Sequence, residues 1–390
     1  MSTERPLACV IGGMDLVRPL GLAAVHSAVV IDRGDVAAHS RFTRAVVPLA
    51  DPVREPDLLL DRLMAFAERQ PEPPVLFYGQ DTDLLFVSRR RDRLRDGFRF
   101  VVADPDLVED LVDKARFDDL VHRLELPVPA SSVRSTSTVA PDEVGVRFPV
   151  VVKPRARERG NWHAVADGAK ALRADTPGEL RELWSRLARE RLEVVVQELV
   201  PGPESRVESY HVYVDAAGDV AGEFSGRKIR TSPSAYGETT ALEITAERDV
   251  LELGRELVRR IGLRGVAKLD FKRDYGGRLH LLEVNPRFNL WHHPGAKAGV
   301  NLPALVYGDL VGLPRPQPRA ARPGVRWMYH KQDARAAHRD GLPMRRWVPW
   351  AVSCEAKSIV SLDDPLPIVM GALKRFGRAV GVGPRPAGHA

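Results

Sequence analysis

The sequence predicts an α/β fold in the first part of the chain and an α+β fold further along, and two patterns indicate this. In the first part of the chain, short apolar runs alternate with helical patterns, which is typical of a parallel sheet. Further along, strand patterns follow one another more closely, and Gly276-Gly277 between two alternating runs indicates a hairpin. A proline-rich linker at residues 313–318 then sets off the last part of the chain.

The first unit is expected to span residues 1–111, an N-terminal parallel-sheet domain. The apolar run at residues 7–12 ends in Gly12-Gly13 and predicts the first strand, because it is too short for a signal peptide. The remaining elements are expected as strands at 28–32, 44–48, 75–78 and 98–103, and as helices at about 15–24, 55–69 and 82–93.

The second unit is expected at residues 112–312, with lobes at about 112–200 and 201–312. A polar Ser/Thr stretch at 131–138 is interpreted as a connection. Residues 319–390 hold three of the six tryptophans and are expected to form an extension or cap. The elements of the second unit are expected as helices at 113–124, 176–189, 247–261 and 302–310, and as strands at 148–153, 193–200, 206–214, 220–228, 265–273 and 278–285.

Composition excludes several classes of protein. The chain is 44% hydrophobic and 28% charged, ordinary values for a soluble globular protein. No run approaches the roughly 20 apolar residues that span a bilayer, so no membrane partner is expected. Cys9 and Cys354 show no pairing logic, which favours a reducing cytoplasm. A homodimer is compatible with the sequence.

The net charge of +6 raises the question of nucleic-acid binding. The arginines are interleaved with acidic residues rather than gathered in one block, so no nucleic-acid partner is expected. Only ten of the 58 basic residues are lysines. A lysine retained in such a chain hints at the need for a compact point charge, and this draws attention to Lys114, Lys153, Lys268 and Lys272.

The segment from residue 268 to 287 carries the most information. A turn centred on Gly276-Gly277 would place Asp270 opposite Glu283 and Lys268 opposite Asn285. The strand period of two then gives the hairpin a polar face and an apolar face. The polar face would carry Lys268, Asp270, Lys272, Glu283 and Asn285, and the apolar face Leu269, Phe271, Leu282 and Val284.

Two carboxylates that face each other repel unless a cation lies between them. Oxygen ligands from Asp270, Glu283 and the Asn285 amide suit Mg²⁺, which needs only one or two carboxylates when phosphates complete its shell. The flanking lysines would neutralise a polyphosphate. The alternative is an exposed hairpin face held by Lys/Asp/Glu salt bridges, which are common and contribute little.

Three further motifs precede this hairpin: a helix start at 113–117, the run 148–154 and the run 194–204. Their order and spacing resemble the ATP-grasp superfamily. Within it the chain is similar to the carboxylate–amine ligase group related to D-aspartate ligase and the carbamoyl-phosphate synthase large chain. The likeness covers about residues 7–312. It implies a pre-ATP-grasp domain with a parallel sheet, and two α+β lobes that enclose ATP.

The resemblance also implies roles for individual residues. Mg²⁺, or Mn²⁺ in its place, would accompany ATP. Glu204 would bond the ribose, with a loop-surface acid as the alternative, and Arg287 would steady an acyl phosphate or cap the hairpin by a salt bridge. The other implied roles are ATP contact for Lys114 and Lys153, adenine recognition for Gln197 (side chain), Glu198 and Val200 (backbone), metal binding for Asp270, Glu283 and Asn285, and contact with the transferring phosphate for Lys268.

Other segments leave their roles open. The loop after Lys153 reads Arg-Ala-Arg-Glu-Arg-Gly at 155–160, where many family members carry a glycine-rich phosphate loop. Lys170 is a further phosphate contact or a surface lysine. Residues 12–15 and 79–83 lie at the carboxyl ends of parallel strands, where ligands of α/β sheets usually bind. Asp81 and Asp83 in the second segment either hold an ammonium group or cap a helix. Residues 225–230 are a substrate clamp or an exposed strand end, and residues 291–295 are second-substrate contacts or ordinary packing.

The function implied by the resemblance is ATP-dependent ligation of a small-molecule carboxylate, such as an amino acid or peptide, to an amine. Transfer of the γ-phosphoryl group makes an acyl phosphate, the amine displaces phosphate, and ADP is released. One alternative is an ATP-grasp carboxylase or a carbamoyl-phosphate-type enzyme. Another is a non-enzymatic nucleotide or nucleic-acid binder, which would show steep salt dependence.

Overall fold

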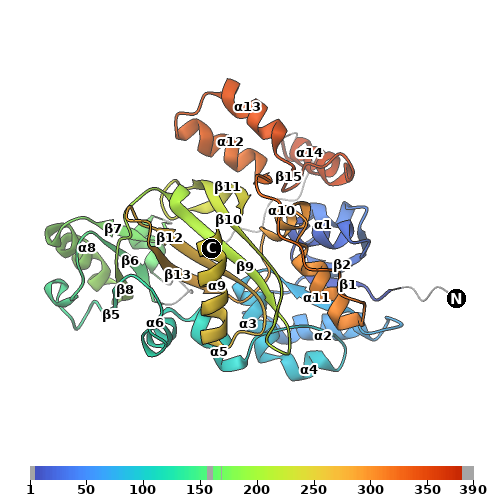
Figure 1. Cartoon of the computed structure of the whole chain (residues 1–390), viewed down its shortest axis with the longest axis horizontal. Helices are drawn as coiled ribbons and strands as arrows, with labels where there is room; N and C mark the ends of the chain where they lie inside the picture. The colour runs from blue at the N-terminus through green and yellow to red at the C-terminus, as the bar shows by residue number, and fades with distance from the viewer. Residues whose placement is uncertain (1–4, 156–160, 168, 380–390) are drawn as a thin grey trace.

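The computed structural model describes residues 5–155, 161–167 and 169–379. These residues form three β-sheets with helices packed on them (Figure 1). The mixture of one parallel sheet with two largely antiparallel sheets confirms the predicted fold class. None of the helices in the described ranges combines the length and the apolar character that a membrane span requires.

The N-terminal sheet has the strand order β3-β2-β1-β4, and all its neighbours are parallel. The predicted strand at 98–103 does not form, because this segment contributes only an isolated bridge between Arg99 and Val75. The elements are β1 (Ala8–Ile11), α1 (Met14–Leu22), β2 (Ser27–Ile31), η1 (Val36–His39), β3 (Thr43–Pro48), α2 (Pro56–Ala67), β4 (Val75–Tyr78), α3 (Asp81–Arg89) and α4 (Arg91–Arg95).

A second sheet, with the order β5-β8-β6-β7, forms a separate small lobe. Leu180, Trp184 and Leu187 of α8 pack on its inner valines because they recur on one face of the helix. The polar stretch at 131–138 is not merely a connection, since it contains β5. The elements from 105 to 198 are α5 (Pro105–Val112), α6 (Lys114–Arg123), β5 (Ser131–Ser135), η2 (Pro141–Glu143), β6 (Val150–Pro154), α7 (Trp162–Ala166), β7 (Leu172–Ala174), α8 (Pro177–Arg189) and β8 (Glu193–Glu198).

The largest sheet has seven strands in the order β13-β12-β9-β10-β11-β14-β15. Three of these strands were not predicted: β11, and the last two, which come from the C-terminal extension. Helix α9 packs against β9, where Gly254 lets the Tyr210 ring approach closely. The elements up to the linker are η3 (Glu204–Arg206), β9 (Val207–Val214), β10 (Val220–Ser232), β11 (Glu238–Thr245), α9 (Arg248–Ile261), β12 (Gly265–Arg273), β13 (Leu279–Asn285), α10 (His292–Lys297) and α11 (Leu302–Val311).

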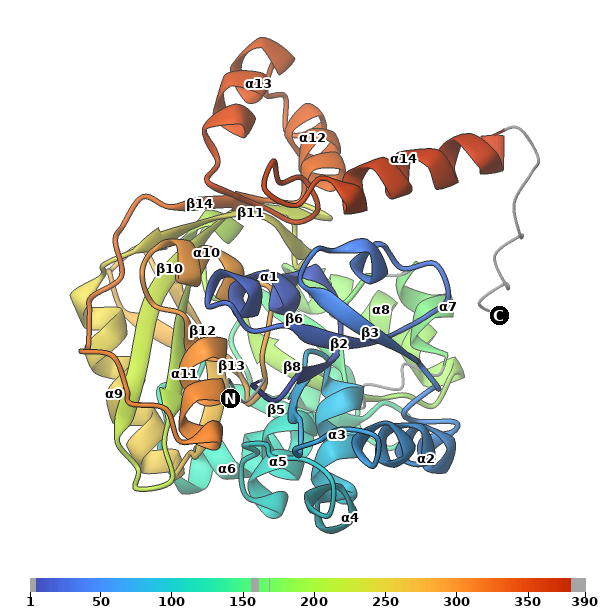
Figure 2. The ribbon, with the colours of Figure 1, turned by 90° about the vertical axis from the view of Figure 1, so that its right-hand side faces the viewer.

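The C-terminal extension lies along one side of the molecule (Figure 2). Its strands β14 (Arg326–Met328) and β15 (Ala356–Lys357) continue the central sheet beyond β11. Helices α12 (His330–Arg339) and α13 (Met344–Ser353) lie above that sheet edge, whereas α14 (Leu366–Ala379) lies over the N-terminal domain. The extension therefore contacts two parts of the molecule at once.

The hairpin of β12 and β13 differs from its predicted form near the turn. Tyr275–Gly277 form a three-residue loop instead of a Gly-Gly turn, and Gly277 takes the positive φ of +87° that such a loop requires. A β-bulge at Leu282 then absorbs one extra residue in β13. The two differences cancel, so Asp270 still pairs with Glu283 and Lys268 with Asn285.

Candidate active site

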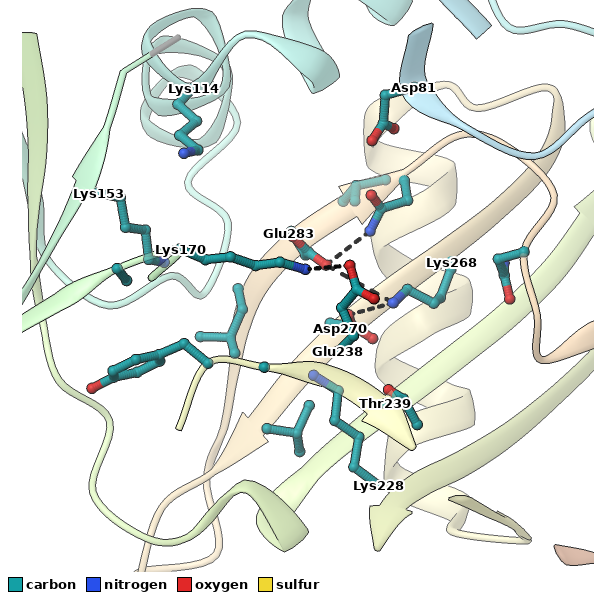
Figure 3. A pocket seen from close by; sticks show the side chains of 18 of the residues that line it. Asp81, Lys114, Lys153, Lys170, Lys228, Glu238, Thr239, Lys268, Asp270 and Glu283 are labelled. Carbon is teal, nitrogen blue, oxygen red and sulfur yellow. Dashed lines mark hydrogen bonds and ion pairs between the residues drawn. The ribbon is translucent and has the colours of Figure 1, made fainter. Parts of the chain in front are cut away.

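A cavity of about 920 Å³ opens where the three sheets meet. Its walls come from the ends of β1 and β4, from the small lobe and from β10 to β13. Figure 3 shows Lys114, Lys153 and Lys170 extending from the small-lobe side toward Asp270 and Glu283. The structure brings every predicted site residue to this cavity: Lys114, Lys153, Gln197, Glu198, Val200, Glu204, Lys268, Asp270, Glu283, Asn285 and Arg287.

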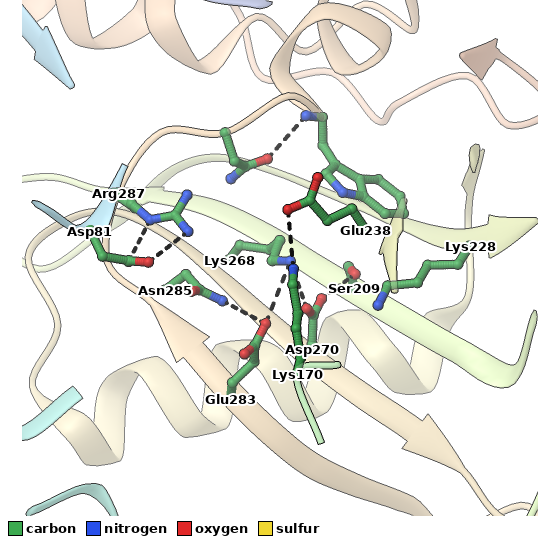
Figure 4. Close-up of polar contacts among 12 residues, drawn as sticks. Asp81, Lys170, Ser209, Lys228, Glu238, Lys268, Asp270, Glu283, Asn285 and Arg287 are labelled. Atoms are coloured by element: carbon green, nitrogen blue, oxygen red, sulfur yellow. Dashed lines mark hydrogen bonds and ion pairs between the residues drawn. The ribbon is translucent and has the colours of Figure 1, made fainter. Parts of the chain in front are cut away.

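Two opposed carboxylates form the floor of the cavity (Figure 4). Lys268 Nζ lies 2.6 Å from Asp270 Oδ2 and 3.9 Å from Glu283 Oε1, so one ammonium group serves both acids. Asn285 Nδ2 donates a hydrogen bond to Glu283 Oε1 at 3.0 Å. Ser209 Oγ donates to the other oxygen of Asp270 from the neighbouring strand β9.

The two acids differ in their surroundings. Asp270 is 2% exposed, and this burial raises its pKa, although the Lys268 ammonium opposes the effect. The Glu283 side chain is 53% exposed and faces the cavity. Desolvation by the cavity walls would raise its pKa, but Lys268, together with the hydrogen bond from Asn285, holds the pKa of Glu283 well below its usual range. Glu283 is therefore the more acidic and the more exposed of the two acids.

This donor set fits a hard divalent cation. Two carboxylates and an amide oxygen are the ligand types that Mg²⁺ prefers, and a positively charged group already lies between the acids. Within the described ranges, no group of three or more His, Cys, Asp or Glu residues is placed to hold a metal. A metal held here would therefore need oxygen ligands from its substrate, as Mg²⁺ bound to a nucleotide has.

The small lobe supplies two amines on the opposite wall. Lys153 Nζ, on β6, donates to Gln197 Oε1 on β8 at 2.9 Å, across neighbouring strands. Lys114 Nζ donates to the Pro154 carbonyl at 2.7 Å. Lys114 is the first residue of α6, whose N-cap Asp113 accepts from two backbone N–H groups of the first turn. Burial lowers the pKa of Lys153, whereas the charges of Glu283 and Glu204 raise it.

The connection after β8 borders the same wall. The Glu198 side chain forms a bidentate pair with Arg147, with its nearest atoms 3.1 Å apart, and the Glu198 backbone N–H donates to the Ala130 carbonyl at 2.8 Å. Glu204, whose side chain is 17% exposed, lies 3.8 Å from Lys272 Nζ and 4.0 Å from Lys228 Nζ. Glu204 is therefore a cavity acid between two lysines and not a surface residue.

Arg287 joins the hairpin to the N-terminal domain. Its Nε donates to Asp81 Oδ1 at 2.6 Å, and its Nη1 donates to the Gly79 carbonyl at 2.9 Å. The Asp81 carboxylate is therefore engaged in a salt bridge with Arg287 instead of holding the ammonium group of a substrate. Asp83 is a helix cap, because it accepts a hydrogen bond from the Gln80 backbone at the start of α3.

The structure also locates the segments whose roles could not be decided from the sequence. Lys228 lines the cavity, but Arg227 pairs with Glu243, and Arg230 pairs with Asp333 of the extension. Lys170 also lines the cavity and lies 3.2 Å from Glu238. In the arginine-rich loop, Arg155 pairs with Glu193; its other two arginines and its glycine, residues 157, 159 and 160, fall outside the described residues.

The adjacent histidines after the hairpin are packing residues. His292 and His293 are 0% and 4% exposed and do not line the cavity, whereas Trp291 does. His292 lies edge-on to Phe288 and to His211, which itself stacks on Phe224 at 4.5 Å. The second-substrate role considered for these histidines is therefore wrong.

The far end of the cavity contains the predicted strand-end segment 12–15 together with residues for which the sequence indicated no role. Asp15 and Leu16 of α1 line it, as do Thr239 and Thr240 of β11 and Tyr329 of the extension. Asp15 follows the Gly12-Gly13 pair at the end of β1, where ligands of parallel sheets usually bind. The sequence predicted a ligand-binding position at residues 12–15 on that ground, whereas no local signal marks Thr239, Thr240 or Tyr329.

Comparison with known proteins adds an independent observation. A family model described as ATP-grasp in the biosynthetic pathway with Ter operon matches residues 191–332. A D-alanine–D-alanine ligase of Halorhodospira halophila is 30% identical over 213 residues, which are 50% of this chain and 64% of that protein. D-aspartate ligase of Enterococcus faecium is 23% identical over 234 residues, 58% of this chain and 56% of that protein. The chain thus spans roughly three fifths of the length of these relatives.

The fold is also similar to that of a solved structure. The L-amino acid ligase from Bacillus licheniformis superposes with a TM-score of 0.59 over 80% of this chain and 75% of that chain, at 16% identity. At this identity the likeness concerns the fold alone.

Proposed function

Because the chain belongs to the ATP-grasp superfamily, we propose that it is an ATP-dependent carboxylate–amine ligase that forms an amide or peptide bond through an acyl phosphate. The observation that carries the proposal is the pairing of Asp270 with Glu283 across β12 and β13, facing the amines of Lys114 and Lys153 over one cavity. The two relatives named above are ligases of amino acids by their names, which supports amino acids or peptides as substrates.

Each wall of the cavity has a task in this proposal. Lys114 and Lys153 neutralise the phosphates of ATP, the connection from Gln197 to Val200 borders the adenine, and Glu204 accepts hydrogen bonds from the ribose. Asp270, Glu283 and the Asn285 amide oxygen would hold Mg²⁺, or Mn²⁺ in its place. When bound, this ion supplies neutralisation of the charge that develops on the phosphates.

The reaction itself balances without a protein nucleophile. A carboxylate oxygen of the substrate attacks the γ-phosphorus, and the bond from that phosphorus to ADP breaks. The amine nitrogen then bonds to the acyl carbon, the C–O bond to phosphate breaks, and phosphate leaves with the proton lost by nitrogen. Lys268 lies beside both acids and would steady the transferring group, since positioning and charge do most of the work in phosphoryl transfer.

The test is an ADP-release screen over pairs of carboxylates and amines, including amino acids of both hands. We expect ADP and phosphate to appear in equal amounts with a coupled product, and only when both substrates are present. A parallel arm offers bicarbonate in place of the carboxylate. ADP release that requires bicarbonate would replace the proposal with a carboxylase. A chain that binds no Mg·ATP would overturn it altogether.

A further inference from the structure

The C-terminal extension is fixed to the central sheet by a buried ion pair. Asp333 in α12 is 0% exposed and pairs with Arg230 of β10, with N–O distances of 2.7 and 2.8 Å. The same carboxylate accepts hydrogen bonds from Thr240 Oγ1 at 3.0 Å and from Trp347 Nε1 at 2.8 Å. A buried carboxylate with this many partners holds α12 in one place on the sheet.

A second anchor fixes the extension to the N-terminal domain. The buried Arg18 of α1 donates to the carbonyls of Lys357 at 2.6 Å and of Ser358 at 3.3 Å. Near the start of α14, Asp364 accepts from Ser40 Oγ at 2.8 Å and from the Arg41 backbone at 2.9 Å. The extension therefore bridges the two parts of the molecule that form the far end of the cavity.

Two side chains of the extension reach that end of the cavity. Tyr329 precedes α12, and its backbone N–H donates to the Thr240 carbonyl at 2.8 Å, which continues the pairing of β14 with β11. Its half-buried ring packs against the cluster that contains Leu16 and Trp291. Gln332, in the first turn of α12, is exposed and lines the cavity. Both positions follow from the two anchors, because these fix the direction of α12.

Two acids, Asp15 and Glu238, line this end of the cavity, and Glu238 lies 3.2 Å from Lys170. Asp15 Oδ1 is buried and has no hydrogen-bond partner within the described part of the chain. Burial raises the pKa of Asp15 to about 7, although Arg18 opposes the effect. Burial also raises the pKa of Tyr329, and the charges of Asp15, Asp35 and Glu238 add to that rise. A buried oxygen without a partner is costly unless a ligand supplies a donor.

On the basis of the proposed ligase function, we propose that the extension forms one wall of an amine-acceptor compartment. Its members are Asp15, Trp291, Tyr329 and Gln332. Tyr329 and Gln332 select the amine, and Asp15 supplies the hydrogen-bond acceptor for a positively charged group on it. The acceptor substrate is then a cationic amine, such as a basic amino acid or a diamine, instead of an acidic one.

The test measures binding and does not depend on turnover. L-arginine, L-lysine and 1,4-diaminobutane are titrated calorimetrically into the full chain in the presence of Mg·ADP, with L-glutamate as the anionic comparison. We expect saturable binding of at least one cationic probe and weaker or undetectable binding of L-glutamate. Asp15→Asn and Gln332→Ala should each raise the dissociation constant of the cationic probe at least fivefold. Tyr329→Ala should raise it further.

Arg335→Ala is the matched control, since Arg335 is exposed on the same helix as Gln332 but does not line the cavity. It should bind the probes as the unaltered chain does. The dissociation constant of Mg·ADP, measured in every variant, should stay within twofold. Loss of Mg·ADP binding by the unaltered chain would count against the ligase function. Normal Mg·ADP binding with no cationic probe bound, or with probe binding unchanged in Gln332→Ala and Tyr329→Ala, would overturn this inference alone.

Discussion

The ammonium of Lys268 lies 2.6 Å from Asp270 Oδ2, two residues along the same strand and on the same face of the sheet. The same nitrogen is 3.9 Å from Glu283 Oε1. A single positive charge thus already lies between the two carboxylates, and in the proposed reaction Mg²⁺ would take over part of that neutralisation.

Glu283→Gln should abolish turnover without unfolding the chain. The substitution removes the charge of the more exposed acid but keeps its shape, so we expect kcat to fall by about 100-fold or more, as for loss of other charge-stabilising groups. The thermal midpoint should change little. Glu256→Gln is the control, because Glu256 is 51% exposed on α9, close to the 53% of Glu283, but lies outside the cavity. Near-normal ADP release by Glu283→Gln would contradict the site.

Lys153→Met should weaken nucleotide binding. The change keeps most of the side-chain volume but removes the amine that faces the cavity and contacts Gln197. We expect the dissociation constant of Mg·ATP to rise by about tenfold or more, equivalent to about 1.4 kcal/mol. Lys331→Met, an exposed position away from the cavity, should bind as the unaltered chain does. Equal affinities of the two variants, measured by calorimetry, would exclude Lys153 from the nucleotide site.

Asp81→Asn should destabilise the fold. The Asp81 and Arg287 side chains are 14% and 16% exposed, so loss of the carboxylate leaves a largely buried guanidinium without its charged partner. Breaking such a pair costs about 3–5 kcal/mol. The control is Asp57→Asn, which breaks an exposed ion pair: the Asp57 side chain is 80% exposed and that of Arg90 is 40% exposed. Loss of this pair should lower the free energy of unfolding by less than about 1 kcal/mol. Urea unfolding measures both, and similar losses would mean that the interdomain pair contributes little.

As the pH falls, the His292→Leu variant should become more stable in comparison with the unaltered chain. Burial lowers the pKa of His292 to about 3, so between about pH 6.5 and 3 the unfolded chain binds a proton there that the folded chain does not. That linkage favours unfolding as the pH decreases through this window, and the variant lacks it. The difference in unfolding free energy between the variant and the unaltered chain should shift in favour of the variant from pH 7.5 to 5.0.

The comparison between the two chains matters for this experiment because other groups act in the opposite direction. Burial raises the pKa of Asp15 to about 7 and that of Asp83 to about 6, which favours the folded state as the pH falls. These contributions are common to both chains and cancel in the difference. A difference that stays constant across the pH range would show that His292 titrates normally in the folded protein.

The superfamily and the fold class could be predicted from local patterns, and both are confirmed. Alternation of side chains places Asp270 opposite Glu283, and the structure has the same pair. The predicted Gly276-Gly277 turn was nevertheless wrong, because no local pattern marks the bulge at Leu282. As a result Leu282, predicted for the apolar face, lines the cavity. The assigned roles of the site residues remain predictions.

Other features could not be read from the sequence because they depend on contacts between distant elements. Strand β11 begins with polar residues and is stabilised by β10 on one side and β14 on the other. Tyr329 and Gln332 lie at the cavity because distant residues fix α12, among them Arg230, which holds Asp333 from 103 residues away in the chain. No local pattern marks such a pairing.

The addition of β14 and β15 to the central sheet has a practical consequence for anyone who shortens this chain. In a fragment that stops at the linker, β11 would become a bare edge strand, and the backbone groups that now pair with residues 326–328 would face solvent. The buried Trp327 and Val325 would also be missing from the core cluster that they share with Leu242 and Ile244. Such a fragment would expose an unpaired edge strand that can pair with another chain. It would therefore be prone to aggregate, even though its sequence motifs are complete.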